Sequence, residues 1–272
     1  MITMLLRVIF GTFLFCLSVI PSENMCTAQE KEQFIFRTVT NSAFSVNERL
    51  VFDIRYGFIT AGKAIMEIES LTTYKNRQSY FISVKVNSAS TFDWIFKVRD
   101  LYISVVDKEG IFPWRFEQHI REGNYKRDFL ALFDHPNGTV TTSAKKKYTI
   151  TPFIHDIVSA FYFTRTVNFS AIKKFDELHL QNFYKDSSYA LDVIYLGKED
   201  IEVDSGKFHT IKIRPMVREG GLFKNTDAMT VWLTDDEVKM PVKMSSKIII
   251  GAVVAELREY VEPSGKITAK YK

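Results

Sequence analysis

The chain has little cysteine: only two of its 272 residues, Cys16 and Cys26, are of this type. Residues after position 28 therefore have no thiol that could form a disulfide, bind a metal through sulfur or act as a nucleophile. A domain without disulfides depends on its hydrophobic core for stability. A chain of this length is long enough to bury such a core.

The sequence also lacks long apolar runs beyond its first twenty residues. Arg7 precedes the uncharged apolar run Val8–Ile20, a proline ends that run, and small residues at Cys26 and Ala28 fit a cleavage site. This order predicts a secretory signal peptide over residues 1–28, because the run is shorter than the roughly 20 residues that span a bilayer. An uncleaved N-terminal anchor is the alternative interpretation.

We therefore expect an exported chain, periplasmic or secreted, with association with the outer membrane as a further option. After cleavage of the signal peptide, no segment is long and apolar enough to form a transmembrane helix.

The charge is nearly balanced, with 36 Lys and Arg against 32 Asp and Glu, a formal net charge of +4. Lysines cluster at residues 145–147 and again at Lys266, Lys270 and Lys272, where we interpret them as solvated loop and tail charge. The sequence has no basic stripe with interleaved aromatic residues, and this excludes nucleic acid as an expected partner.

Motifs of catalysis and of cofactor binding are absent from the sequence. It contains no Gly-x-Ser-x-Gly elbow, no phosphate loop and no dinucleotide fingerprint, and its five histidines do not occur at metal-ligand spacings. The acidic run Asp235–Glu237 is interpreted as a turn, without the spaced ligands of a calcium loop. We expect no catalytic residue, no metal site, no cofactor and no enzymatic activity.

Alternation of apolar and polar residues is what the sequence has in abundance. From Glu48 onward the side chains alternate with a period of two, and turn residues interrupt the pattern at short intervals. The clearest example is Tyr80–Val86, in which every second residue is apolar. The pattern predicts strands at Leu50–Tyr56, Ala61–Leu71, Tyr80–Val86, Asp100–Val106, Trp114–Arg121, Tyr125–Phe133, Thr139–Ser143, Glu177–Phe183, Tyr189–Glu199, Asp200–Val203, Phe208–Met216, Ala228–Leu233, Pro241–Ile248 and Ala252–Tyr260.

A single segment, Asp156–Arg165, has helical spacing. Asp156 is suited to cap the helix N-terminus, Ser159 stands at the third helical position, and Arg165 places a cation at the C-terminal end. A nearby histidine, with Asp156 and Ser159, could suggest a catalytic triad, but a triad is assembled by tertiary contacts rather than along one short helix. We interpret Asp156, Ser159 and Arg165 as structural helix-capping residues.

These elements predict a mainly β fold: an antiparallel meander that forms a barrel, half-barrel or sandwich, with one short helix packed against it. We expect a flexible lead-in over residues 29–47, a single β-rich domain over residues 48–262 and a basic tail over residues 263–272. The sequence contains no repeat of fixed period and no linker that would divide the domain.

Four segments together resemble a known family. They read ERLVFDIRYGFITAGKAIMEI, HDIVSAFYFTR, EVDSGKFHTIKIRP and VWLTDDEVKMPVKMSSKIIIGAVVAEL, and they span about Glu48 to Leu257. In this order they resemble the bacterial exported family called domain of unknown function 3108, in which an Asp-x-x-Ser-Ala helix with a trailing Arg corresponds to the helix proposed above. The resemblance implies an exported envelope protein with a largely β fold, and it implies no catalytic residues.

The aromatic content, 14% of the chain, has two interpretations. Core packing is the simpler one. A barrel or half-barrel with an apolar mouth could instead hold a lipid or another hydrophobic small molecule, with the helix as a plug or lid. Candidate ligand-binding residues lie in a strand that is apolar on both faces and in the helix: Tyr189, Leu191, Val193, Tyr195 and Phe161.

Three functions remain open from the sequence. The first is a cell-envelope protein that binds a hydrophobic ligand or an envelope protein partner. The second is a hydrolase that acts on an envelope polymer, and it requires an acid–base pair gathered from separate strands. The third is a structural partner in an envelope assembly, and it requires a broad exposed apolar patch.

Overall fold

The computed structural model describes residues 33–217, 229–247, 251–261 and 264–272, so the predicted signal peptide lies outside the described residues. The chain divides into two units, residues 1–34 and residues 35–272. The second unit contains all of the helices and strands that the structure describes.

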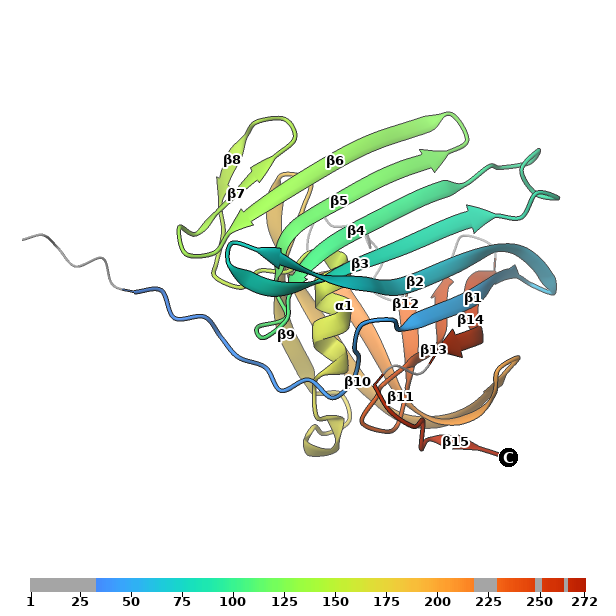
Figure 1. The fold of residues 1–272 in the computed structure, drawn as a ribbon. Helices are drawn as coiled ribbons and strands as arrows, with labels where there is room; N and C mark the ends of the chain where they lie inside the picture. The colour runs from blue at the N-terminus through green and yellow to red at the C-terminus, as the bar shows by residue number, and fades with distance from the viewer. Residues whose placement is uncertain (1–32, 218–228, 248–250, 262–263) are drawn as a thin grey trace, which may run out of the picture. The chain divides into compact units, whose positions relative to one another are not determined.

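The second unit is built on one antiparallel sheet (Figure 1). Hydrogen-bonded neighbours follow the order β8-β7-β6-β5-β4-β3-β2-β1-β14-β13-β12-β11-β10-β9, and β15 pairs with β11 off this path. The strands are β1 (Arg49–Tyr56), β2 (Ile59–Tyr74), β3 (Arg77–Ser88), β4 (Arg99–Asp107), β5 (Pro113–Glu122), β6 (Tyr125–Asp134), β7 (Thr139–Thr142), β8 (Lys147–Thr149), β9 (Glu177–Tyr184), β10 (Ser187–Val203), β11 (Gly206–Val217), β12 (Met229–Thr234), β13 (Pro241–Lys247), β14 (Ala252–Val261) and β15 (Lys270–Tyr271).

The sheet is curved but open, because its path ends at β8 and β9 and these two strands do not pair. Register shifts in the β1, β2 and β10 ladders mark bulges, and bulges bend and twist a strand. The long strand β10 contains such a shift between Tyr195 and Gly197. The backbone φ at Gly197 is 102°, a conformation that glycine adopts more easily than any other residue. The sequence pattern divided this segment farther along, between Glu199 and Asp200, whereas the structure has one continuous strand.

The α-helix α1 (Ile157–Arg165) packs against the sheet and contacts both β4 and β9 (Figure 1). Asp156 caps it: its side chain accepts hydrogen bonds from the backbone N–H groups of Val158 and Ser159, and the Ser159 hydroxyl completes the capping box. A 3-10 helix, η1 (Phe169–Ala171), follows α1. The predicted fold class, a mainly β antiparallel meander with one short packed helix, is confirmed, and of the barrel, half-barrel and sandwich that the sequence left open the unclosed sheet corresponds to a half-barrel.

Arg165, which the sequence analysis placed as a cation at the helix C-terminus, lies inside the core. It is fully buried, and its guanidinium donates to both carboxylate oxygens of Glu48 at 2.6 Å. It also donates to the carbonyl oxygens of Ala43 and Val238. Arg165 therefore joins the helix to the segment that precedes β1 and to the loop after β12.

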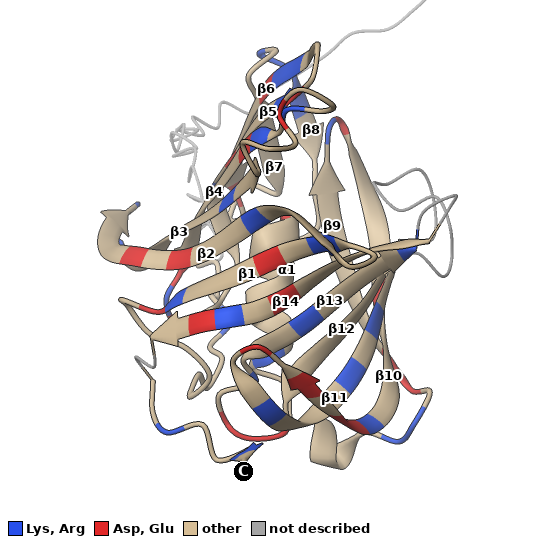
Figure 2. Ribbon diagram, turned by 90° about the vertical axis from the view of Figure 1, so that its right-hand side faces the viewer, with Lys and Arg blue, Asp and Glu red and all other residues tan. Residues whose placement is uncertain are grey.

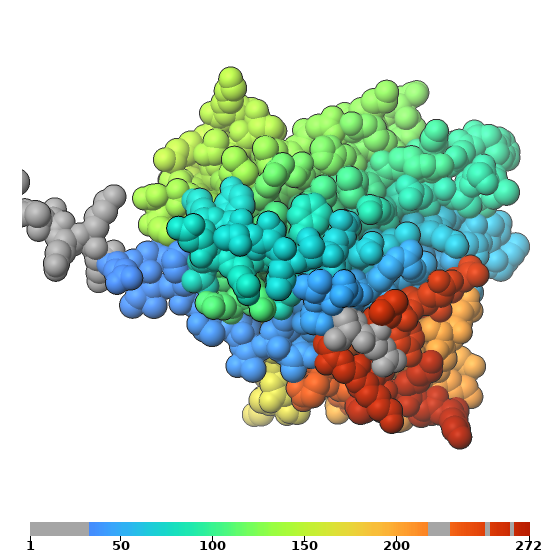
Figure 3. Space-filling model, viewed as in Figure 1, coloured from blue at the N-terminus to red at the C-terminus, as the bar shows by residue number. Residues whose placement is uncertain are grey.

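Part of the segment predicted as a flexible lead-in, residues 35–47, packs on the domain. Ala43 and Phe44 are buried in the main core, where Phe44 contacts Tyr80 and Tyr162 edge to face. The N–H of Val39 donates to the carbonyl of Glu109. This segment therefore covers the core (Figure 3). The alternation of apolar and polar residues could not predict its burial, because the segment has no regular secondary structure.

The basic tail over residues 263–272 is also packed where the structure describes it. Ile267 and Ala269 are buried, and Lys270–Tyr271 forms β15 against β11. The N–H of Ala269 donates to Asp236, within the acidic turn that the sequence analysis placed at Asp235–Glu237. Figure 2 shows acidic and basic residues together along the strands β1 and β14, consistent with the near-balanced charge of the chain.

Candidate functional site

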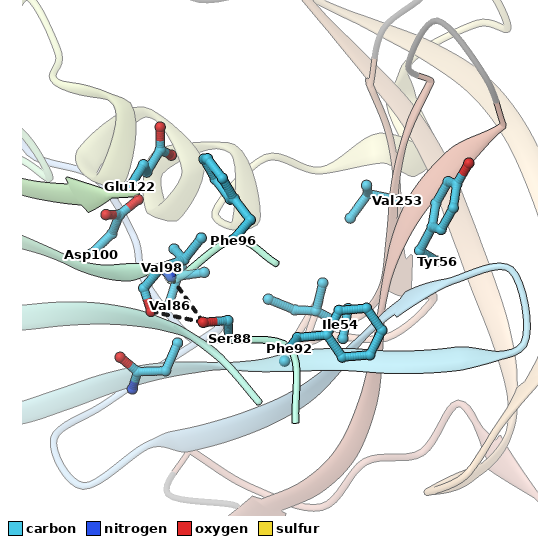
Figure 4. A pocket seen from close by; sticks show the side chains of 13 residues that line it. Ile54, Tyr56, Val86, Ser88, Phe92, Phe96, Val98, Asp100, Glu122 and Val253 are labelled. Atoms are coloured by element: carbon cyan, nitrogen blue, oxygen red, sulfur yellow. Dashed lines mark hydrogen bonds between the residues drawn. The ribbon is translucent and has the colours of Figure 1, made fainter. Parts of the chain in front are cut away.

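A cavity of about 420 Å³ lies inside the curve of the sheet at one end of the strands. Its walls come from β1, β2, β3, β4, β5 and β14 and from the connection between β3 and β4 (Figure 4). Apolar side chains form most of the wall: Ile54, Tyr56, Ala61, Val86, Phe92, Phe96, Val98 and Val253. Cavities of this size and composition are typical of sites that hold small hydrophobic molecules.

Local sequence explains how this wall is assembled. A Cβ atom at Gly62 would lie 2.4 Å from the carbonyl oxygen of Asn87, so only glycine allows β2 and β3 to approach this closely beside the cavity. The β3–β4 connection folds over the cavity in successive turns, in which the N–H of Phe96 donates to the carbonyl of Phe92. Asp93 anchors this connection through hydrogen bonds from Ser88 and Arg99.

Two carboxyl groups, those of Asp100 and Glu122, lie side by side at one side of the cavity, opposite Tyr56 and Val253 (Figure 4). Asp100 is only 6% exposed and accepts a hydrogen bond from the backbone N–H of Arg121. Burial, the charge of Asp100 and a hydrogen bond between the two carboxyl groups raise the pKa of Glu122. Glu122 therefore keeps its proton to a higher pH than an exposed glutamate would.

The cavity continues toward the helix in two smaller spaces. The first, about 200 Å³, shares Ile54, Val86 and Val253 with the large cavity and adds Met244 and Ala255 among other residues. The second, about 70 Å³, lies between α1 and the strands β10, β11 and β12, and Met229 lines both smaller spaces. The three spaces form a series of apolar compartments along the inner face of the sheet.

Three of the five predicted ligand-binding residues come together in the smallest compartment: Phe161 of α1 with Leu191 and Val193 of β10. Tyr195 is buried in the same core cluster but packs its ring against Phe169. Tyr189 is half-buried near the start of β10 and does not line this compartment. The large cavity lies elsewhere, against β1–β5 and β14.

The residues of the large cavity were not predicted from the sequence, although a signal for the carboxyl pair was present. Glu122 has the same parity in β5 as the buried residues Phe116, Gln118 and Ile120, and this places it on the inner face. Asp100 likewise has the parity of Ser104 in β4. A charged residue at an inward position of a strand is a reason to expect a functional role.

A second group of ionisable side chains lies outside these compartments. Glu177, His179 and Asp192 on β9 and β10 hold possible ligand atoms within 4.8 Å of one another. Nδ1 of His179 lies 2.6 Å from a carboxylate oxygen of Asp192 and 3.9 Å from one of Glu177. The His179 contact with Asp192 is an ordinary hydrogen bond, and we interpret the group as a polar cluster at the sheet edge.

In the part of the chain that the structure describes, no helix has the length and apolar character needed to cross a membrane. A search of curated proteins gives no match.

Two solved structures are similar to the chain. One is a β-barrel-like protein of the domain of unknown function DUF1849 from Brucella abortus, with a TM-score of 0.50 and 11% identity, covering 79% of this chain and 97% of that one. The other, from Bacteroides fragilis, is described as a candidate exported protein with a YmcC-like fold; its TM-score is 0.37 at 9% identity, covering 84% of this chain and 100% of that one. At this identity the Brucella structure supports the fold alone.

The family model described as "Protein of unknown function (DUF3108)" matches residues 51–258, which span β1 to β14 and include all six cavity-lining strands. The match agrees with the resemblance seen in the sequence, and the chain belongs to this DUF3108 family.

Proposed function

We propose that this chain binds a hydrophobic ligand in the apolar compartments of its half-barrel and does not act as an enzyme. The observation that carries the proposal is the cavity of about 420 Å³ with its mainly apolar wall. Apolar surface left in contact with water inside a fold is unfavourable, by about 25 cal/mol per Å², so a ligand that displaces this water gains free energy. The predicted signal peptide supports a place for this binding outside the cytoplasm.

The carboxyl pair defines the polar end of the proposed ligand. Asp100 and Glu122 can accept hydrogen bonds from a ligand hydroxyl or amine, or balance a cationic group. A ligand carboxylate or phosphate at this position would face like charge in a poorly hydrated site. We therefore propose a ligand with an apolar body and a hydrogen-bond-donating or cationic end, such as a long-chain alcohol or amine.

The replacement Val86→Trp tests the cavity directly. Val86 lines both the large cavity and its neighbour of about 200 Å³, so an indole at this position fills space that a ligand needs. We expect wild-type protein to enhance the fluorescence of N-phenyl-1-naphthylamine, an apolar amine, and we expect V86W to weaken that binding about tenfold or more.

Lys85→Trp is the matched control, because Lys85 precedes Val86 in β3 and points to the opposite face of the sheet. K85W should bind the probe as wild type does, and circular dichroism should show both variants folded. Equal binding by V86W and wild type, with both folded, would contradict the proposal.

The charge of the pair predicts a pH dependence for ligands with a cationic end. The pKa of Glu122 is raised by burial and by Asp100, so with rising pH the pair gains its second negative charge later than an exposed glutamate would. We expect the affinity for octadecylamine to rise as pH increases through this raised pKa, and the affinity for octadecanol to change little. Titrations of wild type and Glu122→Gln at several pH values measure this, and E122Q should lose the pH dependence.

A hydrolase is the second candidate function, because the structure does place two carboxyl groups together beside a cavity. Their direct hydrogen bond argues for binding, since glycosidase carboxyl groups stand about 5–9.5 Å apart with the scissile bond between them. Purified protein and E122Q should show equal, background turnover of chromogenic ester and glycoside substrates. Turnover by wild type that E122Q lacks would favour the hydrolase.

A further inference from the structure

Large apolar side chains project into solvent from the hairpin ends beside the mouth of the cavity. Phe58, in the β1–β2 connection, is 98% exposed, and Trp94, in the β3–β4 connection, is 81% exposed. Ile95 and Phe96 follow Trp94 and are also exposed, as is Tyr125 at the β5–β6 turn. We call these five residues the apolar tips.

The topology places all the apolar tips at one end of the sheet. In an antiparallel meander the connections alternate between the two ends, so the β1–β2, β3–β4 and β5–β6 connections share one end (Figure 1). Phe96 also lies against the β5–β6 turn, because a Cβ at Gly123 would stand 3.1 Å from its ring. The N–H of Gly123 donates to the carbonyl of Lys97, which joins two of these connections.

The apolar tips are continuous with the ligand site. Phe96 is exposed and also lines the large cavity, and Tyr56, beside the β1–β2 turn, has the same two properties (Figure 4). A surface that contacts the tips therefore also contacts the entrance of the cavity.

Two lysines lie beside the apolar tips, and the carboxyl groups of Asp100 and Glu122 lie in the cavity wall. Lys97 and Lys126 are exposed and directly follow Phe96 and Tyr125. The nearest acidic side chain of the β3–β4 connection, Asp93, is already paired with Arg99 at 2.6 Å. Aromatic and aliphatic side chains flanked by lysines match the two layers of a bilayer surface, the apolar region beneath and the anionic headgroups above.

We propose that the apolar tips dock this end of the half-barrel onto a phospholipid bilayer that contains anionic lipid. Phe58, Trp94 and Ile95 enter the headgroup–acyl boundary, and Lys97 and Lys126 contact lipid phosphates. The docked orientation points the cavity mouth at the membrane, the source of an apolar ligand. Docking rests on the exposed tips rather than on ligand binding, and the two can be tested apart.

Trp94 reports docking at the site itself. Of the three tryptophans, Trp114 and Trp232 are buried, so a change in emission on adding vesicles arises from Trp94. We expect the emission of the full chain to shift to the blue with vesicles of phosphatidylethanolamine and phosphatidylglycerol. Brominated phospholipid in the same vesicles should quench it. Emission that stays unchanged would overturn the proposal.

Paired variants identify the surface. Phe58→Ser with Ile95→Ser should lower vesicle partition about tenfold or more, because both lose apolar contact with the lipid. Phe175→Ser is the control: Phe175 is 66% exposed but precedes β9, at the opposite end of the sheet. The N-terminal segment is common to all these proteins, so differences between them report the tips. An equal loss in F175S would overturn the assignment.

Two further variants distinguish bilayer docking from ligand binding and test the part of the lysines in docking. Lys97→Ser with Lys126→Ser should weaken partition into vesicles with phosphatidylglycerol several-fold and leave partition into phosphatidylcholine vesicles nearly unchanged. V86W should dock as wild type does, so a failure of docking and a failure of ligand binding are distinct results. Dimerisation without lipid that F58S/I95S abolishes would assign the tips to a second copy of the chain and overturn bilayer docking.

Discussion

Replacing Arg165 with Met is expected to lower the free energy of unfolding by about 3–5 kcal/mol. Arg165 and Glu48 are both fully buried and form a bidentate ion pair at 2.6 Å. Removing the guanidinium leaves the Glu48 carboxylate in the core without its partner, and it also removes donors to the carbonyls of Ala43 and Val238. Urea denaturation at pH 7, followed by far-ultraviolet circular dichroism, measures the change.

The double variant, Glu48→Met with Arg165→Met, distinguishes the effect of an unpaired buried charge from the effect of lost side-chain packing. With both charges gone, the remaining side chains are apolar and similar in length to those they replace, so much of the lost stability should return. The conservative variant Arg165→Lys keeps the charge but cannot bond both oxygens, and it should lie between wild type and R165M. A urea midpoint of R165M equal to that of wild type would show that the Arg165–Glu48 pair contributes nothing to stability.

Replacing Asp156 with Ala is the second large effect, expected to cost about 2–4 kcal/mol. One carboxylate oxygen caps α1 by accepting from Val158 and Ser159, and the other accepts from the hydroxyl of Ser104 in β4 at 2.6 Å. Alanine therefore loses the helix cap and leaves a buried hydroxyl without its acceptor. The same denaturation measurement applies, with Asp156→Asn as the control.

The asparagine control also tests the ionisation of Asp156. Burial raises the pKa of Asp156 from its usual 3.8 to about 6, against the lowering effect of its hydrogen bonds. A carboxyl whose pKa is higher in the folded state holds its proton more tightly there than in the unfolded state. Its favourable contribution to the free energy of unfolding is therefore complete below about pH 4 and is lost as pH rises through 6.

Asparagine keeps an acceptor for the two amides and can donate to Ser104, but it does not titrate. The stability of wild type relative to D156N should therefore fall as pH rises from about 4 to 7. A difference that stays constant over this range would contradict the raised pKa.

The candidate site was only partly predictable. The sequence identified Phe161, Leu191 and Val193 as candidates for an apolar site, and the structure does gather them in one small compartment. It did not identify the large cavity, whose wall joins residues of β1 and β3 to Val253 of β14. The β1–β14 pairing joins residues about two hundred positions apart, and nothing local to either strand specifies such a partner.

By itself, the sequence determined the mainly β fold class, the helix with its Asp156 cap and the approximate strand positions, because side-chain alternation and capping depend on residues only a few positions apart. The tertiary structure decided the burial of Phe44 in a segment without regular structure, the pairing of Arg165 with Glu48 and the meeting of Asp100 with Glu122. These contacts depend on strand register, bulges and sheet curvature. Such features arise when the whole chain minimises its exposed apolar surface, and no short segment contains the information that sets them.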